Sequence, residues 1–325
     1  MKPLDLSRLG PRPQFAEGLC TSRELALLGF GDRSVPDLVA DGVIIRLRRG
    51  CYGLASPKYP DCTVPHRERL ERLRHIRAHA LERASTGASL NFSYSGVSAA
   101  ALLGMSLWTA ERRIHLVQPF KSSSRDHARD VVKAYRPNVP TQSVEGLPCT
   151  SPSETVVDCL RILPREPAMI VCESALAQGL VDGDSLLAAV QRARYRRGVE
   201  AARAVVAAAS RLSESPGETR TLLVLRSLPL PAPVQQFGVQ VGAHTYRLDF
   251  AWPDLRVGLE FDGLVKYTGA IPTSEILKRE RERENALVDD GWVIVRITWS
   301  DLAHPLRIQA MLERAFERAR RYRAA

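Results

Sequence analysis

Two neighbouring stretches in the last third of the chain alternate hydrophobic residues with polar or small ones. Apolar side chains occupy every second position there: Tyr246, Leu248, Phe250 and Trp252, then Val257, Leu259 and Phe261. A period of two is typical of half-buried strands, and the Pro-Asp-Leu-Arg sequence between the stretches has residues that turns favour. The pattern therefore predicts two antiparallel strands joined by a four-residue turn.

This hairpin is predicted to bring two acidic residues together. If Trp252 faces Val257 across the turn, counting back places Asp249 directly opposite Glu260. Like charges on facing strands destabilise a sheet, and a bound Mg²⁺ removes that cost because it favours sites with one or two carboxylates. Asp249 and Glu260 are therefore candidate ligands of a metal ion.

An ion-pair network is the alternative interpretation of the same face. The same register places Arg247 opposite Asp262, and Arg256 and Lys266 lie close by in the sequence. Salt bridges would then offset the acidic charges without any metal. The residue pattern leaves both interpretations open.

Further helices and strands are predicted around the hairpin. In order they are a helix over 219–228, strands over 236–241, 246–252 and 257–261, a helix over 274–289, a strand over 292–298 and a helix over 305–322. Ser215, Pro216 and Glu218 form the start signal of the first helix. Helix capping is thus a sufficient structural reason for Glu218 to stand at that position.

The beginning of the chain has the pattern of two short helices followed by a hairpin. Thr21 and Glu24 form a capping box before the first helix, and Ser34 is the expected cap of the second. Strands over 43–47 and 51–54 follow, with glycine at the turn between them. This order predicts a winged helix-turn-helix, a motif whose second helix enters the major groove of DNA.

Four arginines are candidates for contacts with DNA in this region. Arg33 precedes the second helix, and Arg46, Arg48 and Arg49 cluster on the hairpin. Arginine side chains that contact phosphates position a protein on the duplex without reading its sequence. The alternative is a protein-interaction module, because winged helices also dock proteins.

Between these two regions the pattern is mainly helical. Helices are expected over 67–84, 94–104, 166–180, 184–195 and 199–212, with a strand over 113–117. Another helix begins after Ser151, with Pro152 in its first position and Glu154 closing a capping box. We interpret this region as an α-rich scaffold that dimerises or binds a partner.

The charge balance favours a polyanionic partner. The 325 residues include 46 Lys and Arg against 36 Asp and Glu, a formal net charge of +10. Nucleic acid is the usual partner of such a basic chain. The sequence has no signal-peptide pattern and no apolar run of membrane-spanning length, so we expect a cytoplasmic protein without a membrane partner.

Two of these stretches resemble a known family. The run from Thr21 to Leu54, with its R-x-R-R-G-x-Y ending, and the T-S-P-x-x-T-x-x-D stretch that ends at Asp158 resemble the AbiEi family. AbiEi proteins are the antitoxins of type IV abortive-infection toxin–antitoxin systems. The resemblance implies a DNA-binding transcriptional regulator with a cognate toxin as its partner.

The last third of the chain resembles a second family. The run Glu260-Phe-Asp-Gly263 and the segment from Arg283 to Trp299 are similar to the PD-(D/E)XK nuclease fold, and more narrowly to very-short-patch repair endonucleases. The resemblance implies that Asp249 and Glu260 hold Mg²⁺ and that Glu218 supports the metal or the attacking water. The lysine of the family motif falls on Asp262, which leaves Lys266 as the nearest substitute.

These observations predict an α/β multidomain protein. Its parts are a winged helix-turn-helix over 1–62, an α-rich middle domain over 63–212 and a restriction-endonuclease-like domain over 213–325. The predicted function is that of a DNA-binding transcriptional regulator whose partner is double-stranded DNA. A homodimer is the oligomeric state considered for it. The alternatives are a Mg²⁺-dependent endonuclease targeted by the winged helix, and an antitoxin that binds protein alone.

Overall fold

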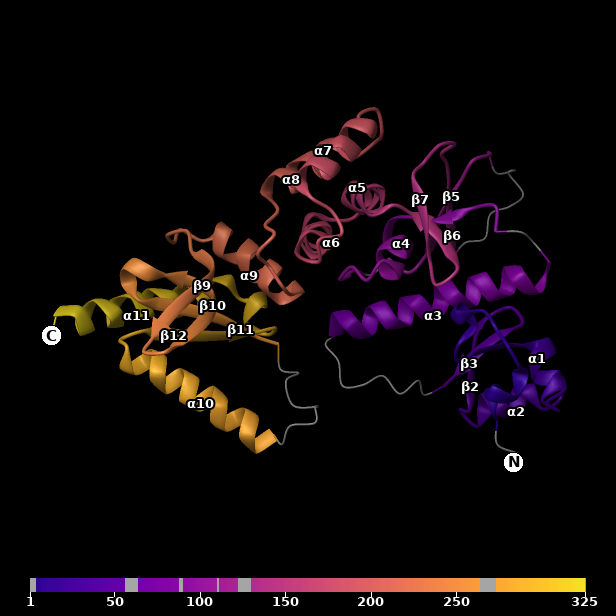
Figure 1. The fold of residues 1–325 in the computed structure, drawn as a ribbon, viewed down its shortest axis with the longest axis horizontal. Helices are drawn as coiled ribbons and strands as arrows, with labels where there is room; N and C mark the ends of the chain where they lie inside the picture. The colour runs from indigo at the N-terminus through magenta and orange to yellow at the C-terminus, as the bar shows by residue number, and fades with distance from the viewer. Residues whose placement is uncertain are drawn as a thin grey trace. The chain divides into compact units, whose positions relative to one another are not determined.

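The protein is a mixed α/β chain with three sheets, seen in a computed structural model that describes residues 4–55, 64–87, 90–109, 111–121, 130–263 and 273–324. Contacts divide these residues into two compact units (Figure 1). The first unit takes the described residues of 1–59, 64–171 and 179–207, and the second takes those of 172–178 and 208–325. The first unit therefore takes most of both segments that the sequence predicted as separate domains, 1–62 and 63–212, while residues 172–178 and 208–212 belong to the second unit.

The first unit begins with helices packed on a three-stranded sheet. Its elements are η1 (Leu6–Leu9), η2 (Gln14–Ala16), β1 (Leu19–Thr21), α1 (Ser22–Leu27), α2 (Val35–Ala40), β2 (Ile44–Arg48) and β3 (Cys51–Leu54), with strand order β1-β3-β2. The capping box of Thr21 and Glu24 is confirmed in both directions. Ser34 does not cap α2 as predicted, because its hydroxyl donates to the carbonyl of Gly31 instead.

A second sheet corrects the expectation of an α-rich middle region. After α3 (Val64–Ser85) and β4 (Ser93–Tyr94) come α4 (Gly96–Leu102), β5 (Ile114–Gln118), β6 (Val131–Tyr135), β7 (Thr141–Val144) and β8 (Leu147–Thr150). The strands form a five-stranded sheet in the order β6-β5-β4-β8-β7. Only β5 was predicted, because β4, β7 and β8 are shorter and β6 lacks a clear apolar alternation.

Four helices follow this sheet in the chain, and the first of them begins differently from the prediction. They are α5 (Pro152–Ile162), α6 (Arg165–Ala177), α7 (Gly183–Arg192) and α8 (Val199–Ala208). Ser151 is the N-cap residue of α5, but its side chain makes no capping hydrogen bond. Glu154, predicted to close a capping box, is buried and accepts hydrogen bonds from Arg136 and Arg192. The start of α5 is therefore held by ion pairs rather than by a capping box.

The second unit has the element order that the sequence predicts. It contains α9 (Pro216–Ser227), β9 (Val234–Val241), β10 (His244–Trp252), η3 (Pro253–Leu255), β11 (Val257–Asp262), α10 (Thr273–Asp289), β12 (Val293–Thr298), η4 (Asp301–Ala303) and α11 (Pro305–Ala324). The strands form one sheet in the order β12-β11-β10-β9, in which β11 and β12 run parallel.

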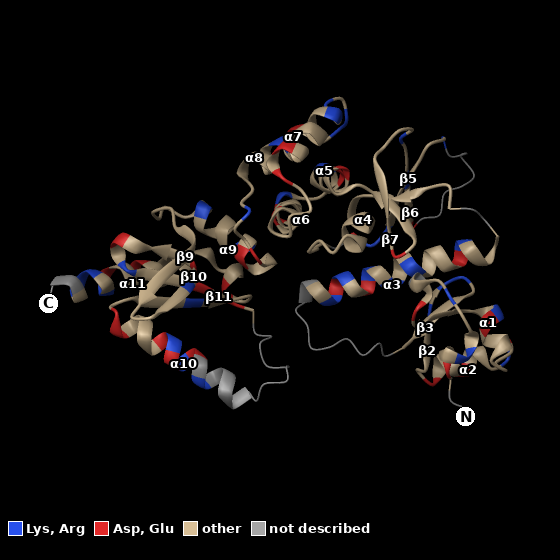
Figure 2. Cartoon of the chain, in the orientation of Figure 1, with Lys and Arg blue, Asp and Glu red and all other residues tan. Residues whose placement is uncertain are grey.

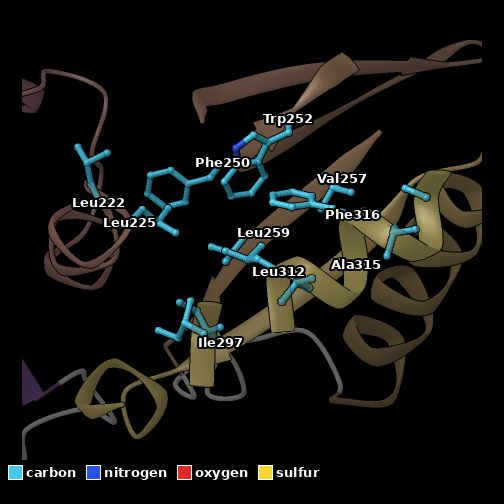
Figure 3. Packing of buried hydrophobic residues seen from close by; sticks show 14 of the residues in the cluster. Leu222, Leu225, Phe250, Trp252, Val257, Leu259, Ile297, Leu312, Ala315 and Phe316 are labelled. Atoms are coloured by element: carbon cyan, nitrogen blue, oxygen red, sulfur yellow. The ribbon is translucent and has the colours of Figure 1, made fainter. Parts of the chain in front are cut away.

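Apolar residues cover both faces of this sheet. One cluster joins Phe250, Trp252 and Leu259 to residues of α9 and α11, among them Leu222 and Phe316 (Figure 3). A second cluster joins Leu248, Ala251 and Val239 to Leu287 of α10 and to Trp292. The sheet is thus a layer between helices, which explains why Ala251, predicted on the polar side of its strand, is fully buried.

Candidate functional site

Two of the acidic residues predicted as a site, Glu218 and Asp249, lie where α9 approaches β11, whereas Glu260 is paired with Arg283 of α10. Gly217, in the first turn of α9, packs directly on the ring of Phe261. A Cβ atom added at Gly217 would lie 2.0 Å from a ring carbon of Phe261, so only glycine permits this approach. The Phe261 ring in turn meets Trp299 edge to face, with ring centroids 4.9 Å apart. This packing fixes the start of α9, and with it Glu218, against the sheet.

Glu218 is a buried carboxyl group whose environment favours the protonated form. Its Oε2 atom accepts hydrogen bonds from the Glu214 amide and from Gln236 Nε2, both at 2.9 Å. Burial, together with the nearby charges of Asp249 and Glu214, raises the pKa of Glu218 from 4.5 to about 7. The amide of Glu218 is itself capped by Ser215 Oγ at 3.1 Å. The residue therefore has the capping surroundings expected from the sequence and, in addition, a second acid close to its carboxyl group.

Asp249 lies at an irregular point of the sheet. The pairs Trp252–Val257 and Phe250–Leu259 have the predicted register. At the next residue of β10 away from the turn, the Asp249 carboxylate accepts the amide hydrogen of Phe261 at 2.9 Å. On the other neighbouring strand Gln236 has φ of +51°, a left-handed conformation that is uncommon for any residue except glycine. Strained backbone of this kind is often found at functional sites.

Glu260 is held by arginines, which favours the ion-pair interpretation for this residue. Arg283 of α10 donates to Glu260 Oε1, and Arg296 Nε lies 3.5 Å from Glu260 Oε2. Arg247, which was predicted to face Asp262, pairs with Glu214 at 2.6 Å. Two guanidinium groups beside the Glu260 carboxylate oppose the approach of a metal cation.

The predicted metal site is therefore only partly assembled. The fold brings Glu218 close to Asp249, while the carboxylate of Glu260 is engaged by arginines. Among the described residues, no group of three His, Cys, Asp or Glu side chains is arranged to hold a metal ion. Glu218 and Asp249 are the residues that would hold Mg²⁺ here. Lys266, predicted as a catalytic substitute, lies outside the described residues.

The four arginines predicted to contact DNA fall into two groups. Arg33, Arg46 and Arg49 have exposed side chains and form no ion pair with the described part of the chain. Arg48 instead donates to Glu82 of α3 at 2.6 Å and also to Asp130, and only 13% of its side chain is exposed. Arg48 is therefore a structural residue that fixes the hairpin to α3, along which basic and acidic residues are interspersed (Figure 2).

A β-bulge separates Arg46 from Arg48. The β2–β3 register shifts between these two residues, so that Arg46 pairs with Tyr52 and Arg48 with Cys51. In a regular strand, residues two apart point to the same side, and the extra residue of a bulge changes the direction of those that follow. The partners of Arg48 lie 34 and 82 residues away in the chain, so no local sequence signal identifies them.

Comparisons with known proteins give relatives without an assigned activity. No family model matches the chain. Uncharacterized protein MT2308 and uncharacterized protein Rv2248, from the CDC 1551 / Oshkosh and H37Rv strains of Mycobacterium tuberculosis, are each 34% identical over 181 residues. That match covers 55% of this chain and 65% of the length of either relative.

One solved structure is also similar to part of the chain. The RV2827C protein from Mycobacterium tuberculosis matches with a TM-score of 0.36 and 15% identity, over 70% of this chain and 89% of that one.

None of the helices in the described ranges is long and apolar enough to cross a membrane.

Proposed function

We propose that the protein binds double-stranded DNA through residues 19–54, which act as a winged helix-turn-helix. The observation that carries this proposal is the contrast among the wing arginines. Arg46 and Arg49 are exposed and unpaired, while Arg48 between them is tied to Glu82 and Asp130. An anchored hairpin that presents two free guanidinium groups is suited to contacts with phosphates.

One further feature supports DNA as the partner of this region, and another limits how the DNA can be contacted. Arg33, just before α2, adds a third exposed guanidinium group. The helix α2 itself offers few long polar side chains, and Asp37 and Asp41 near it are acidic. Binding is therefore expected to rest on phosphate contacts more than on reading of bases.

The resemblance to AbiEi antitoxins suggests what such binding is for. On that basis we propose a transcriptional regulator of its own locus, with a cognate toxin as protein partner and a homodimer as the form that binds DNA. A neighbouring reading frame that encodes a nucleotidyltransferase-like toxin would support this role.

The proposal predicts how DNA affinity depends on salt. The logarithm of the DNA association constant K falls with the logarithm of the salt concentration, and each lost phosphate contact makes this slope shallower by about 0.9. Replacing Arg33, Arg46 and Arg49 together by alanine should therefore make the slope shallower by about 2.7. The measurement is fluorescence anisotropy of a labelled duplex titrated with the full chain over a series of NaCl concentrations.

A matched control uses an exposed arginine outside the predicted interface. Arg211→Gln removes one positive charge in the second unit and should leave the slope within error of the wild type. An unchanged slope in the triple variant would refute the wing as a phosphate-binding surface and favour the protein-interaction alternative.

A metal-dependent endonuclease is the second candidate function, and one observation favours it. Glu218 and Asp249 are close enough for the charge of Asp249 to raise the pKa of Glu218. Two acids held together against their repulsion are a starting point for a Mg²⁺ site. The ion pairs of Glu260 with Arg283 and Arg296 oppose this function, so we rank it second.

A further inference from the structure

The first unit contains a buried arginine without an acidic partner. Arg72 of α3 is 6% exposed, and its guanidinium donates a hydrogen bond to the main-chain carbonyl of Glu111. No carboxylate within the described ranges forms an ion pair with it. Buried charges in proteins are normally paired, because removing an ion from water without compensation is costly. Arg72 has no such direct pair, and the charges of Glu111 and Glu68 compensate its own charge only in part.

Arg72 lines a cavity of about 430 Å³ between α3, α4 and the segment before β5. This volume lies within the usual range for pockets that hold small molecules. Its other lining residues are Glu71, His75, Ser98, Arg112 and Arg113, and Ile76 and Ile114 give it apolar walls. The cavity therefore combines polar groups with hydrophobic surface, as small-molecule sites do.

A second unpaired cation lies next to Arg72. The side chain of Arg112 is exposed and has no ion-pair partner in the described chain, whereas Arg113 beside it is bound to Glu111. Burial and the charge of Arg112 lower the pKa of Arg72. The two guanidinium groups repel each other, and an anion placed between them would relieve that repulsion. The charges of Glu111 and Glu68 act on Arg72 and offset part of this repulsion.

The hydroxyl group of Ser98, on α4, is also suited to bind an anion. Ser98 Oγ accepts the amide hydrogen of His115 at 3.0 Å, which leaves its hydroxyl hydrogen to donate. A hydroxyl donor beside two guanidinium groups is typical of sites that bind the oxygens of phosphates and carboxylates.

We propose that this cavity binds the oxyanion group, phosphate or carboxylate, of a small molecule with an apolar body. Arg72 and Arg112 bind the oxygens, and Ile76 and Ile114 contact the apolar part. A DNA phosphate is a poorer fit, because a guanidinium that is 6% exposed lies too deep for a duplex backbone to reach. The proposal does not depend on the DNA-binding role of residues 19–54.

Isothermal titration of the full chain at constant ionic strength tests the site. The probes are inorganic phosphate, phenyl phosphate and benzoate, with phenol as the uncharged control. Saturable binding of phenyl phosphate or benzoate, tighter than that of inorganic phosphate or phenol, supports the proposal. The comparison of the two aromatic anions identifies whether the site prefers phosphate or carboxylate.

Variants make the test specific. Arg112→Gln, at an exposed position where folding should be unaffected, is expected to weaken the binding of the preferred anion at least tenfold, because it removes one charge-assisted contact. Arg211→Gln in the second unit should leave the affinity unchanged. Equal affinity in wild type and Arg112→Gln, or no saturable binding of either aromatic anion, would overturn the proposal. So would a loss of duplex affinity in Arg112→Gln without any anion binding, which would assign the arginine to DNA.

Discussion

Replacing Glu154 by glutamine is expected to lower the free energy of unfolding by about 3–5 kcal/mol, the usual cost of removing one partner of a buried ion pair. Glu154 is 2% exposed and joins Arg136, at the end of β6, to Arg192, at the end of α7. Glutamine keeps the shape of the side chain but loses its charge. Arg136, whose side chain is 18% exposed, and the half-exposed Arg192 would then both face a neutral group.

Urea unfolding followed by circular dichroism measures this effect, and Glu200→Gln is the matched control. Glu200 is a 78% exposed glutamate that also pairs with an arginine, Arg203, on the surface of α8. Exposed pairs of this kind contribute about 0.2–1 kcal/mol. A loss for Glu154→Gln no larger than that of the control would contradict the assignment of Glu154 to a buried ion pair.

The stability of the second unit is expected to fall as the pH rises from about 4.5 to about 7. Glu218 binds its proton more tightly in the folded chain, where its pKa is about 7, than at the ordinary value of 4.5. Between these values the native state carries a proton that the unfolded state has lost, so raising the pH favours unfolding. At about 1.4 kcal/mol for each pH unit, the loss is about 3 kcal/mol.

Glu218→Gln should remove this pH dependence, because glutamine keeps a hydrogen-bond acceptor for the Glu214 amide without a titrating group. Thermal melting across pH 4.5–8 is the measurement. Glu317→Gln, at an exposed position on α11, should leave the profile of the wild type unchanged. A profile for Glu218→Gln that matches the wild type would show that the buried carboxyl group does not control stability.

The same experiment distinguishes the two candidate functions. If Glu218 and Asp249 bind Mg²⁺, millimolar Mg²⁺ should raise the melting temperature of the wild type at pH 8 and should have no effect on Glu218→Gln. Such a shift, together with Mg²⁺-dependent nicking of supercoiled DNA, would favour the endonuclease. We expect neither, because Arg283 and Arg296 already neutralise Glu260.

Local patterns predicted much of the second unit. The register of β10 and β11 next to the turn followed from a turn of known length, and the pairs Trp252–Val257 and Phe250–Leu259 confirm it. The pairing ends before Asp249 and Glu260, which were predicted to face each other. The start of α9 followed from Ser215, which caps the helix as expected. These features depend on residues that are close in the sequence, where turn and capping preferences are strong.

Contacts between distant residues were not predictable in the same way. Glu154 fits a capping box in the sequence, and only the fold brings Arg136 and Arg192 to it. Glu260 meets Arg296 because β11 and β12 pair in parallel, an arrangement that the sequence did not specify. The middle sheet was missed because a strand of two residues such as β4 has no periodicity to detect.

Chemical modification of arginines is the most direct test of DNA binding by the wing. Phenylglyoxal should modify exposed Arg33, Arg46 and Arg49 quickly in the free protein and Arg48 slowly, and peptide mass spectrometry can follow each site. Duplex DNA should protect the three exposed arginines and leave the reactivity of Arg211 unchanged. Unchanged modification of Arg33, Arg46 and Arg49 at saturating DNA would contradict the proposal that this surface holds the phosphate backbone.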